Sequence, residues 1–183
     1  MAKVIAAMNM TLDGFCDHTE MTADDEIHQH YTELLSNAGT LLYGRITFQL
    51  MEYWRSVLEN PTGNLATDEF AVTIDKIPKI VFSRTLTDVE WKTARLAKKS
   101  LEEEVLELKA EEGKDVLVGS PGLIAALTQL GLIDEYQLGV QPIILGSGLT
   151  LFKHITDRVD LNLLKTKTFG CGAVFHYYEP AKK

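Results

Sequence analysis

Four short segments place glycine, hydroxyl or arginine residues directly after an apolar run, where a phosphate group could bind. In the first of them, Gly119-Ser120-Pro121-Gly122 follows the apolar residues 116–118. Glycine lets a phosphate approach the backbone closely, and the free amides at the start of the helix that follows attract negative charge. Pro121 suits the first position of that helix, because its missing N–H is not needed there. A tight turn without a ligand is the alternative interpretation.

The second segment, Gly44-Arg45-Ile46-Thr47, follows the apolar residues 41–43. Arg45 would lie in the first turn of a helix, where its positive charge opposes the helix dipole. A side chain placed at such a local cost indicates a ligand, and arginine chemistry favours a phosphate. The alternative is an ordinary surface arginine, with Thr47 only capping the helix.

Two further segments also follow apolar runs and could contact other parts of a ligand. Ser83-Arg84-Thr85 offers hydroxyl and guanidinium donors, which could surround the 2′-phosphate that distinguishes NADPH from NADH. Gly146-Ser147-Gly148 could contact a flat ring or a neighbouring loop, because paired glycines permit a close approach. A polar turn and a flexible turn are the respective alternatives.

Two aspartates, Asp13 and Asp24, are the candidates for proton transfer. The apolar face of a helix is predicted from residues at helical spacing, namely Ile27, Tyr31, Leu34 and Leu35. Asp24 falls within that face, where burial could raise the pKa of its carboxyl group and let it donate a proton. The alternative is that it only favours the positive end of the helix. Asp13 precedes a glycine, so it could equally be a turn residue.

These segments lie between predicted strands and helices that alternate along the chain. Apolar runs predict strands over residues 4–10, 40–43, 79–83, 91–96, 115–118, 136–140, 161–168 and 173–178. Helices are predicted between Thr22 and Gly39, from about Arg45 through Trp54, between Ser100 and Gly113, and over 121–130, with a loop over 61–67. The helix between the strands 115–118 and 136–140 predicts a right-handed crossover and a parallel sheet. The last two strands have no helix between them, so they should pair antiparallel.

The overall composition is that of one globular domain spanning residues 1–183. The formal net charge of −8 argues against a general nucleic-acid-binding protein, although local arginines can still hold an anion. The two cysteines, Cys16 and Cys171, lack a metal-binding spacing, so no metal site is predicted. The apolar run 4–8 is too short for a signal peptide or a membrane helix. We therefore expect a cytoplasmic protein with a small-molecule substrate and no nucleic-acid or membrane partner.

Taken in order, the segments resemble dihydrofolate reductase and, most closely, the C-terminal reductase domain of the bifunctional riboflavin biosynthesis deaminase/reductase. The resemblance covers nearly the whole chain and is carried by residues 10–14, 41–48, 80–85, 118–123, 131–135, 142–148 and 151–152. It implies a three-layer α/β/α fold, with a mostly parallel central sheet and antiparallel C-terminal strands. It also implies a homodimer.

The resemblance further implies NADPH as the cofactor and hydride transfer to a C=N or C=O bond of a small heterocyclic substrate. In riboflavin biosynthesis that substrate is 5-amino-6-(5-phosphoribosylamino)uracil. Asp13 would lie near the nicotinamide and the substrate, and Ser83 and Arg84 would contact the 2′-phosphate. The other phosphates would be held by Gly44, Arg45, Thr47, Gly119, Ser120, Gly122 and Leu123.

Two alternatives to this function are a dihydrofolate reductase and a nucleotide-binding protein without catalysis. In dihydrofolate reductase a carboxylate on the first helix anchors the pterin. Its usual spacing from Gly44 leads here to Ile27 or His28, neither of which is acidic, and Asp24 lies about one turn earlier. Folate reduction therefore fits this sequence less well than reduction of a pyrimidine.

Overall fold

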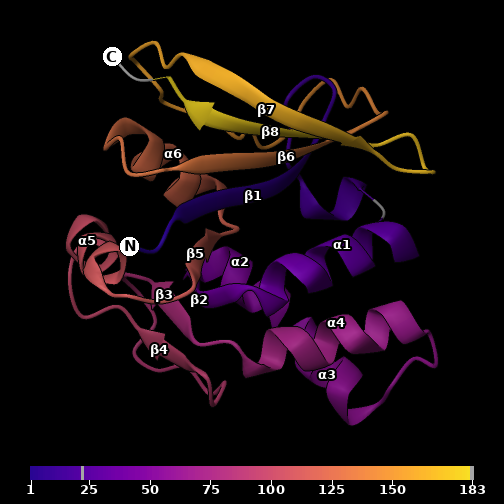
Figure 1. Ribbon diagram of the computed structural model, residues 1–183. Helices are drawn as coiled ribbons and strands as arrows, with labels where there is room; N and C mark the ends of the chain where they lie inside the picture. Colours follow the sequence, from indigo (N-terminus) through magenta and orange to yellow (C-terminus); the bar gives the residue numbers. More distant parts are fainter. Residues whose placement is uncertain (22, 182–183) are drawn as a thin grey trace.

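One mixed sheet runs through the part of the protein that the computed structural model describes, residues 1–21 and 23–181 (Figure 1). Its strands lie in the order β4-β3-β2-β5-β1-β6-β8-β7. The strands from β4 to β6 are parallel, and β8 and β7 join them antiparallel, as the sequence predicted. The strands are β1 (Val4–Thr11), β2 (Ala38–Gly44), β3 (Lys79–Phe82), β4 (Ala94–Leu96), β5 (Asp115–Val118), β6 (Glu135–Gln141), β7 (Leu161–Thr168) and β8 (Val174–Pro180).

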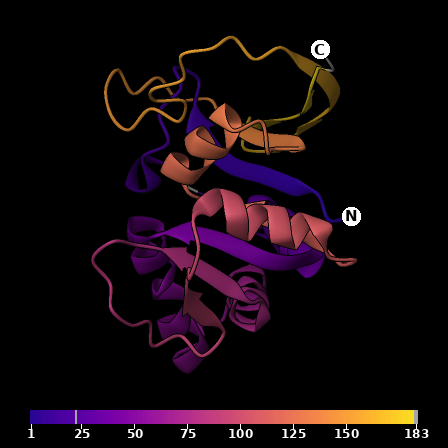
Figure 2. The ribbon, with the colours of Figure 1, turned by 90° about the vertical axis from the view of Figure 1, so that its left-hand side faces the viewer.

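Helices cover both faces of the sheet and give the predicted three layers. One face, called here the α1 face, carries α1 (Asp25–Ser36), α2 (Arg45–Met51), α3 (Tyr53–Glu59) and α4 (Leu65–Lys76). The other, called the α6 face, carries α5 (Leu101–Ala110) and α6 (Pro121–Gln129), which lie in front of the strands in Figure 2. A short 3-10 helix, η1 (His18–Glu20), follows β1. Within the described residues, no helix is both long and apolar enough to cross a membrane.

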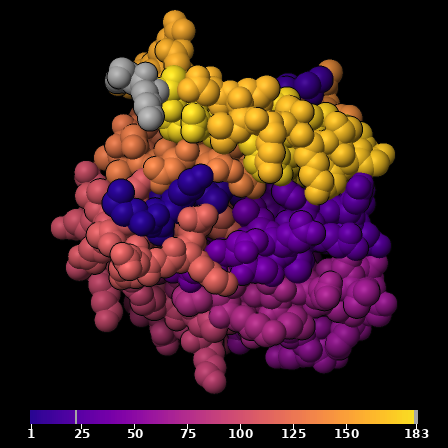
Figure 3. Space-filling view, in the orientation of Figure 1, coloured from indigo at the N-terminus to yellow at the C-terminus, as the bar shows by residue number. Residues whose placement is uncertain are grey.

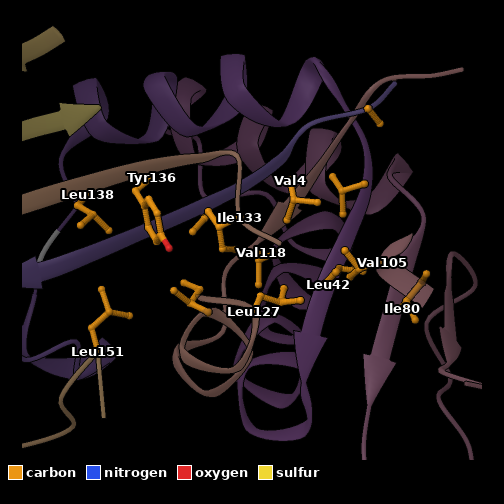
Figure 4. Close-up of a cluster of buried hydrophobic side chains, with 14 of the residues drawn as sticks. Val4, Leu42, Ile80, Val105, Val118, Leu127, Ile133, Tyr136, Leu138 and Leu151 are labelled. Atoms are coloured by element: carbon orange, nitrogen blue, oxygen red, sulfur yellow. The ribbon is translucent and has the colours of Figure 1, made fainter. Parts of the chain in front are cut away.

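A continuous apolar core fills the space between the sheet and the helices α5 and α6 (Figure 4). Val4, Leu42 and Val118 come from three neighbouring strands, and Leu127 of α6 packs against them. The crossover that was predicted from residues 115–140 is present, since β5 and β6 are both parallel to β1, which lies between them. Because β5 lies between β2 and β1 with helices over both faces, every residue of β5 after the first is buried.

Helix ends follow local capping signals where these are strong. Ser100 accepts a hydrogen bond from the Glu103 amide, and the Glu103 carboxylate accepts one from the Ser100 amide, so the predicted capping box of α5 is confirmed. For α1 the cap is Asp24, whose side chain accepts from the Ile27 amide at 2.9 Å. The cap predicted at Thr22 lies outside the described residues. The placement of Asp24 on the buried face of a helix was therefore wrong, because this residue precedes the first helical turn.

The segment 45–76 departs most from the sequence prediction. The predicted helix from Arg45 through Trp54 is two helices, and the chain bends between them at Glu52. The predicted loop over 61–67 ends early, because Asn64 caps α4 by accepting from the Thr67 amide at 2.9 Å. Gly39, predicted to end the first helix, lies inside β2 instead. The missed signal was Asn64 at a capping position, followed by apolar residues at helical spacing.

The β7–β8 hairpin covers one end of the molecule (Figure 3) and is anchored to α1 through Phe175. A Cβ atom at Gly139 of β6 would lie 2.4 Å from Cζ of Phe175 and 2.5 Å from Oδ1 of Asn9. Only glycine therefore lets the Phe175 ring cross over β6. Having crossed, the ring packs against His30 of α1, with the two ring centres 4.6 Å apart.

His30 is an ionisable group inside this apolar contact, with 8% of its surface exposed. Its ring is surrounded by Phe169, Phe175 and Tyr177, and Nε2 has no hydrogen-bond partner among the described residues. Burial, helped by the positive charge of Lys167, lowers the pKa of His30 to about 4. The imidazole is therefore neutral in the folded protein at neutral pH.

We expect His30 to lower the free energy of unfolding by about 2 kcal/mol between pH 7 and pH 5. Between pH 6.5, the ordinary pKa of histidine, and the folded pKa of about 4, the imidazole is protonated in the unfolded chain and neutral in the folded protein. Stability is thus lost as the pH falls through this range. His30→Phe keeps a flat ring but does not titrate, so urea denaturation of this variant should show a smaller loss. Equal losses in both proteins would contradict the assignment.

Candidate functional site

The chain leaves two neighbouring strands, β2 and β5, toward opposite faces of the sheet. Both strands are parallel and end at the same edge. After β2 the chain enters α2 on the α1 face, and after β5 it enters α6 on the α6 face. Neither helix therefore covers the strand ends, and this divergence is where parallel sheets bind ligands. Two predicted segments, Gly44–Thr47 and Gly119–Leu123, meet at this point of divergence, which we call the crevice.

A hydrogen bond joins the two sides of the crevice. The Gly44 amide donates to Oγ of Ser120 at 2.9 Å, and Ser120 is buried. The Ser120 hydroxyl keeps its own hydrogen for another acceptor. Within the described residues, no side chain caps the first amides of α2 or α6, although Gly44 and Ser120 are the N-cap residues. These amides and the Ser120 hydroxyl could together donate to a phosphate.

Three glycines of the crevice are not explained by the protein's own geometry. None of Gly44, Gly119 and Gly122 has a positive φ angle. A Cβ atom at Gly44 would come no closer than 3.8 Å to another atom, and one at Gly119 no closer than 3.5 Å. At Gly122 a Cβ would have nothing within 4 Å. Neither backbone strain nor packing requires glycine here, so the backbone at these three positions is open to the close approach of a ligand.

The other residues predicted for this crevice lie around it on the two helices. Arg45 is the first residue of α2, and its side chain is exposed. Its Nη1 donates to Oε1 of Gln49 at 3.3 Å, and it forms no salt bridge within the part of the chain that the structure describes. Thr47 is half-buried two residues further on, and Leu123 packs partly against the core from α6. Arg45 is thus the cation available at the crevice.

Ser83 and Arg84 lie in a separate cavity of about 300 Å³ beside the crevice, at the end of β3. The Ser83 hydroxyl accepts from the amides of Thr85 at 3.1 Å and Leu86 at 2.9 Å, so it also holds the turn. The sequence analysis missed Lys99, which lines the same cavity next to the start of α5. Its signal was a lysine directly before the capping box. Two cations and a hydroxyl make this cavity suitable for a phosphate.

Another cavity, of about 350 Å³, lies at the opposite end of the sheet, where β6 begins and β8 ends. Asp134 and Glu179 are among its lining residues, and none of the lining residues is a lysine or arginine. Its charge is therefore wrong for a phosphate, although it is the larger of the two cavities.

Asp13 is a hydrogen-bond acceptor that holds a loop. Oδ1 accepts from the Thr11 hydroxyl at 2.6 Å, and Oδ2 accepts from the Gly146 amide at 2.7 Å. The Leu145 amide adds a contact at 3.1 Å to each oxygen. The Thr11 hydroxyl and these amides lower the pKa of Asp13 to about 2. This carboxylate is ionised at neutral pH and positions the loop, and its role in proton transfer stays a prediction.

Asp17 holds the same loop from the other side and was missed by the sequence analysis. Its Oδ2 accepts from the Leu149 amide at 2.6 Å. A Cβ atom at Gly148, which has φ of +146°, would lie 2.1 Å from this oxygen, so only glycine permits the contact. Backbone hydrogen bonds from Leu12 to Ile143 and from Cys16 to Leu149, both 2.8 Å, complete the attachment. We call residues 12–17 and 142–150 the two-loop unit.

Asp24 is committed to the start of α1, since its Oδ1 accepts from the Ile27 amide. The structure does not give it the place on a buried helix face that its predicted catalytic role required. Neither candidate aspartate is thus positioned as a buried acid.

Removing either carboxylate should release the two-loop unit. In Asp13→Ala and Asp17→Ala, we expect amide hydrogen exchange over residues 143–150 to become about tenfold faster or more, because each change deletes charge-assisted hydrogen bonds. Mass spectrometry of the exchanged peptides measures this. Asp157→Ala, at an exposed aspartate elsewhere, is the control. Unchanged exchange in the first two variants would show that the carboxylates do not hold the loop.

Comparisons with known proteins show the family and the fold to which this chain belongs. The sequence matches the RibD C-terminal domain over residues 2–175. The uncharacterised protein YyaP of Bacillus subtilis is 33% identical over 176 residues, which are 94% of this chain and 92% of that protein. A pyrimidine reductase-like protein from Corynebacterium diphtheriae has a similar structure, with 13% identity, a TM-score of 0.67, and coverage of 100% of this chain and 93% of that one.

A second similar structure is the Thermotoga maritima diaminohydroxyphosphoribosylaminopyrimidine deaminase/5-amino-6-(5-phosphoribosylamino)uracil reductase. Its identity is 17% and its TM-score 0.69, and the match covers 98% of this chain but only 57% of that protein. At such identities the likeness shows the shared fold, which is the dihydrofolate-reductase-like α/β fold that the sequence predicted. Because the family match extends over residues 2–175, the chain belongs to the RibD C-terminal domain family.

Proposed function

We propose that this protein is an NADPH-dependent reductase that transfers a hydride to a small heterocyclic substrate. The observation that carries the proposal is the crevice between β2 and β5, where three glycines are required neither by the backbone nor by packing. They leave room for a pyrophosphate against the backbone, beside uncapped helix amides, the Ser120 hydroxyl and Arg45. The nicotinamide ring would supply the hydride, and the protein would bind and orient it.

The preference for NADPH over NADH rests on the cavity at the end of β3. Arg84, Lys99 and Ser83 line it, and it lies beside the crevice because β3 pairs with β2. A 2′-phosphate there would meet two cations. Lys99 also contacts the Glu107 carboxylate, so part of its charge is already compensated. Arg84, which forms no salt bridge within the described residues, would contribute more to the selectivity.

For the substrate, we propose 5-amino-6-(5-phosphoribosylamino)uracil or a close pyrimidine relative. The Thermotoga maritima protein named for this reductase activity shares the fold, and membership of the RibD C-terminal family supports the same class of reaction. Dihydrofolate is less suitable, because Asp24 caps α1 and no acid lies at residue 27 or 28.

We also propose that the active form is a homodimer, joined along β7. This strand is one of the two edges of the sheet, and all eight of its residues are exposed, including Leu161, Leu163 and Leu164. Unpaired backbone groups beside apolar side chains favour pairing with another strand.

We expect Leu163→Asp to yield a monomer in sedimentation velocity. A wild-type protein that sediments as a monomer would refute the dimer.

Calorimetric titration with NADPH and NADH tests the cofactor assignment. Arg84→Ala should weaken NADPH binding about tenfold or more and leave NADH binding nearly unchanged, because only NADPH carries the 2′-phosphate. Arg45→Ala should weaken both, since it acts at the shared phosphates. Arg158→Ala, an exposed arginine in the loop before β7, is the control. A wild-type protein that binds neither nucleotide would overturn the proposed function.

A further inference from the structure

Gln141 is a buried side chain with an unused hydrogen-bond donor. It is the last residue of β6, where it pairs with Thr11, the last residue of β1. Only 4% of its surface is exposed, and its Nε2 has no partner among the described residues. Buried amide groups are nearly always paired, and an exception is expected to have a functional reason.

The neighbours of Gln141 on the sheet are engaged with other groups and do not pair with its Nε2. Side chains alternate along a strand, so Gln141, Gly139, Thr11 and Asn9 share the α1 face. The Thr11 hydroxyl already donates to Asp13 and accepts from the Phe15 amide. Asn9 accepts from the Tyr31 hydroxyl at 3.2 Å, and Gly139 has no side chain. In this arrangement the Nε2 hydrogens of Gln141 are left for a group from outside this row of residues.

The position of Gln141 indicates a ligand as that group. It lies at the carboxyl end of a parallel strand, the edge at which such sheets bind ligands, and the two-loop unit begins at the next residue. Two other buried nitrogens in the described part of the chain also lack partners, but they lie between aromatic rings. His28 contacts Trp54 and Phe70, and His30 contacts Phe169 and Phe175.

We propose that Gln141 determines substrate specificity by pairing with a cyclic amide edge of the substrate. Nε2 would donate to a ring carbonyl oxygen, and Oε1 would accept from the adjacent ring N–H. A uracil ring carries such an edge, so this inference rests on the proposed function and deepens it. A site built for this pair rejects rings without the edge, because the buried amide then stays unpaired. Access requires the two-loop unit to shift, and its carboxylate contacts lie at the surface.

Gln137 offers a matched control on the same strand and face. It is also buried, but its Nε2 donates to Oε1 of Glu135 at 2.8 Å. Methionine has the same length as glutamine without its hydrogen bonds. Gln141→Met should raise KM for 5-amino-6-(5-phosphoribosylamino)uracil about tenfold or more, with NADPH binding unchanged and thermal stability unchanged or higher. Gln137→Met should lower thermal stability and leave KM unchanged.

A binding measurement makes the test independent of turnover. In protein labelled with ¹⁵N-glutamine, the side-chain amide signal of Gln141 is identified by its loss in Gln141→Met. With NADP⁺ present, we expect uracil to shift this signal and to leave that of Gln137 in place.

If uracil leaves the Gln141 signal in place and KM is unchanged in Gln141→Met, the inference is wrong. A fall in thermal stability with unchanged KM would identify a structural role, with an internal water as the partner. Weaker NADPH binding in this variant would overturn the inference by assigning the amide to the cofactor. Failure of the proposed function is distinct from all of these, because the wild-type protein would then not bind NADPH.

Discussion

The hydrogen bond from the Gly44 amide to the Ser120 hydroxyl joins the two strand ends on which the candidate site depends. After these ends the chain turns to opposite faces of the sheet, into α2 and α6. If both helices lay on one face, they would cover the strand ends and leave no crevice. The reversal of direction in the strand order thus creates the site, and the hydrogen bond links the residues that follow the two strands. The glycines then keep the backbone open to a ligand.

A second constraint acts nearer the β7 edge of the sheet, where Gly139 lets Phe175 cross β6 and pack on α1. This contact attaches the antiparallel hairpin to the helix that lies over β1. The same face of the sheet carries Asn9, Thr11 and Gln141. The apolar contact that Gly139 permits therefore lies next to a row of polar side chains at the strand ends. The two-loop unit lies beyond them, and Asp13 and Asp17 attach its loop to the end of β1. Apolar packing and charge-assisted hydrogen bonds therefore meet at the edge where substrate would bind.

Local sequence signals predicted much of the fold. The run 115–118, the glycine turn and the helix that follows are where the sequence predicted them, and so are the capping box of α5 and the final antiparallel pair. The predictions failed where a local signal has two meanings. An aspartate next to an apolar periodicity could belong to the helix or cap it, and Asp24 caps it. The apolar spacing across Glu52 suits one long helix or two short ones, and the structure has two, with α2 packed on β2 and α3 packed on α4.

The sequence by itself determined the strands and the starts of α2, α5 and α6, because these depend on residues within a few positions of each other. The tertiary structure decided what those residues touch. Asp13 and the Gly146 amide are 133 positions apart, and Gly44 and Ser120 are 76 apart. No local pattern encodes such contacts, since they exist only once the strands are ordered in the sheet. The same reason applies to three residues whose surroundings the sequence did not predict. Lys99 lines a cavity, Asp13 holds a loop, and Nε2 of Gln141 has no hydrogen-bond partner among the described residues.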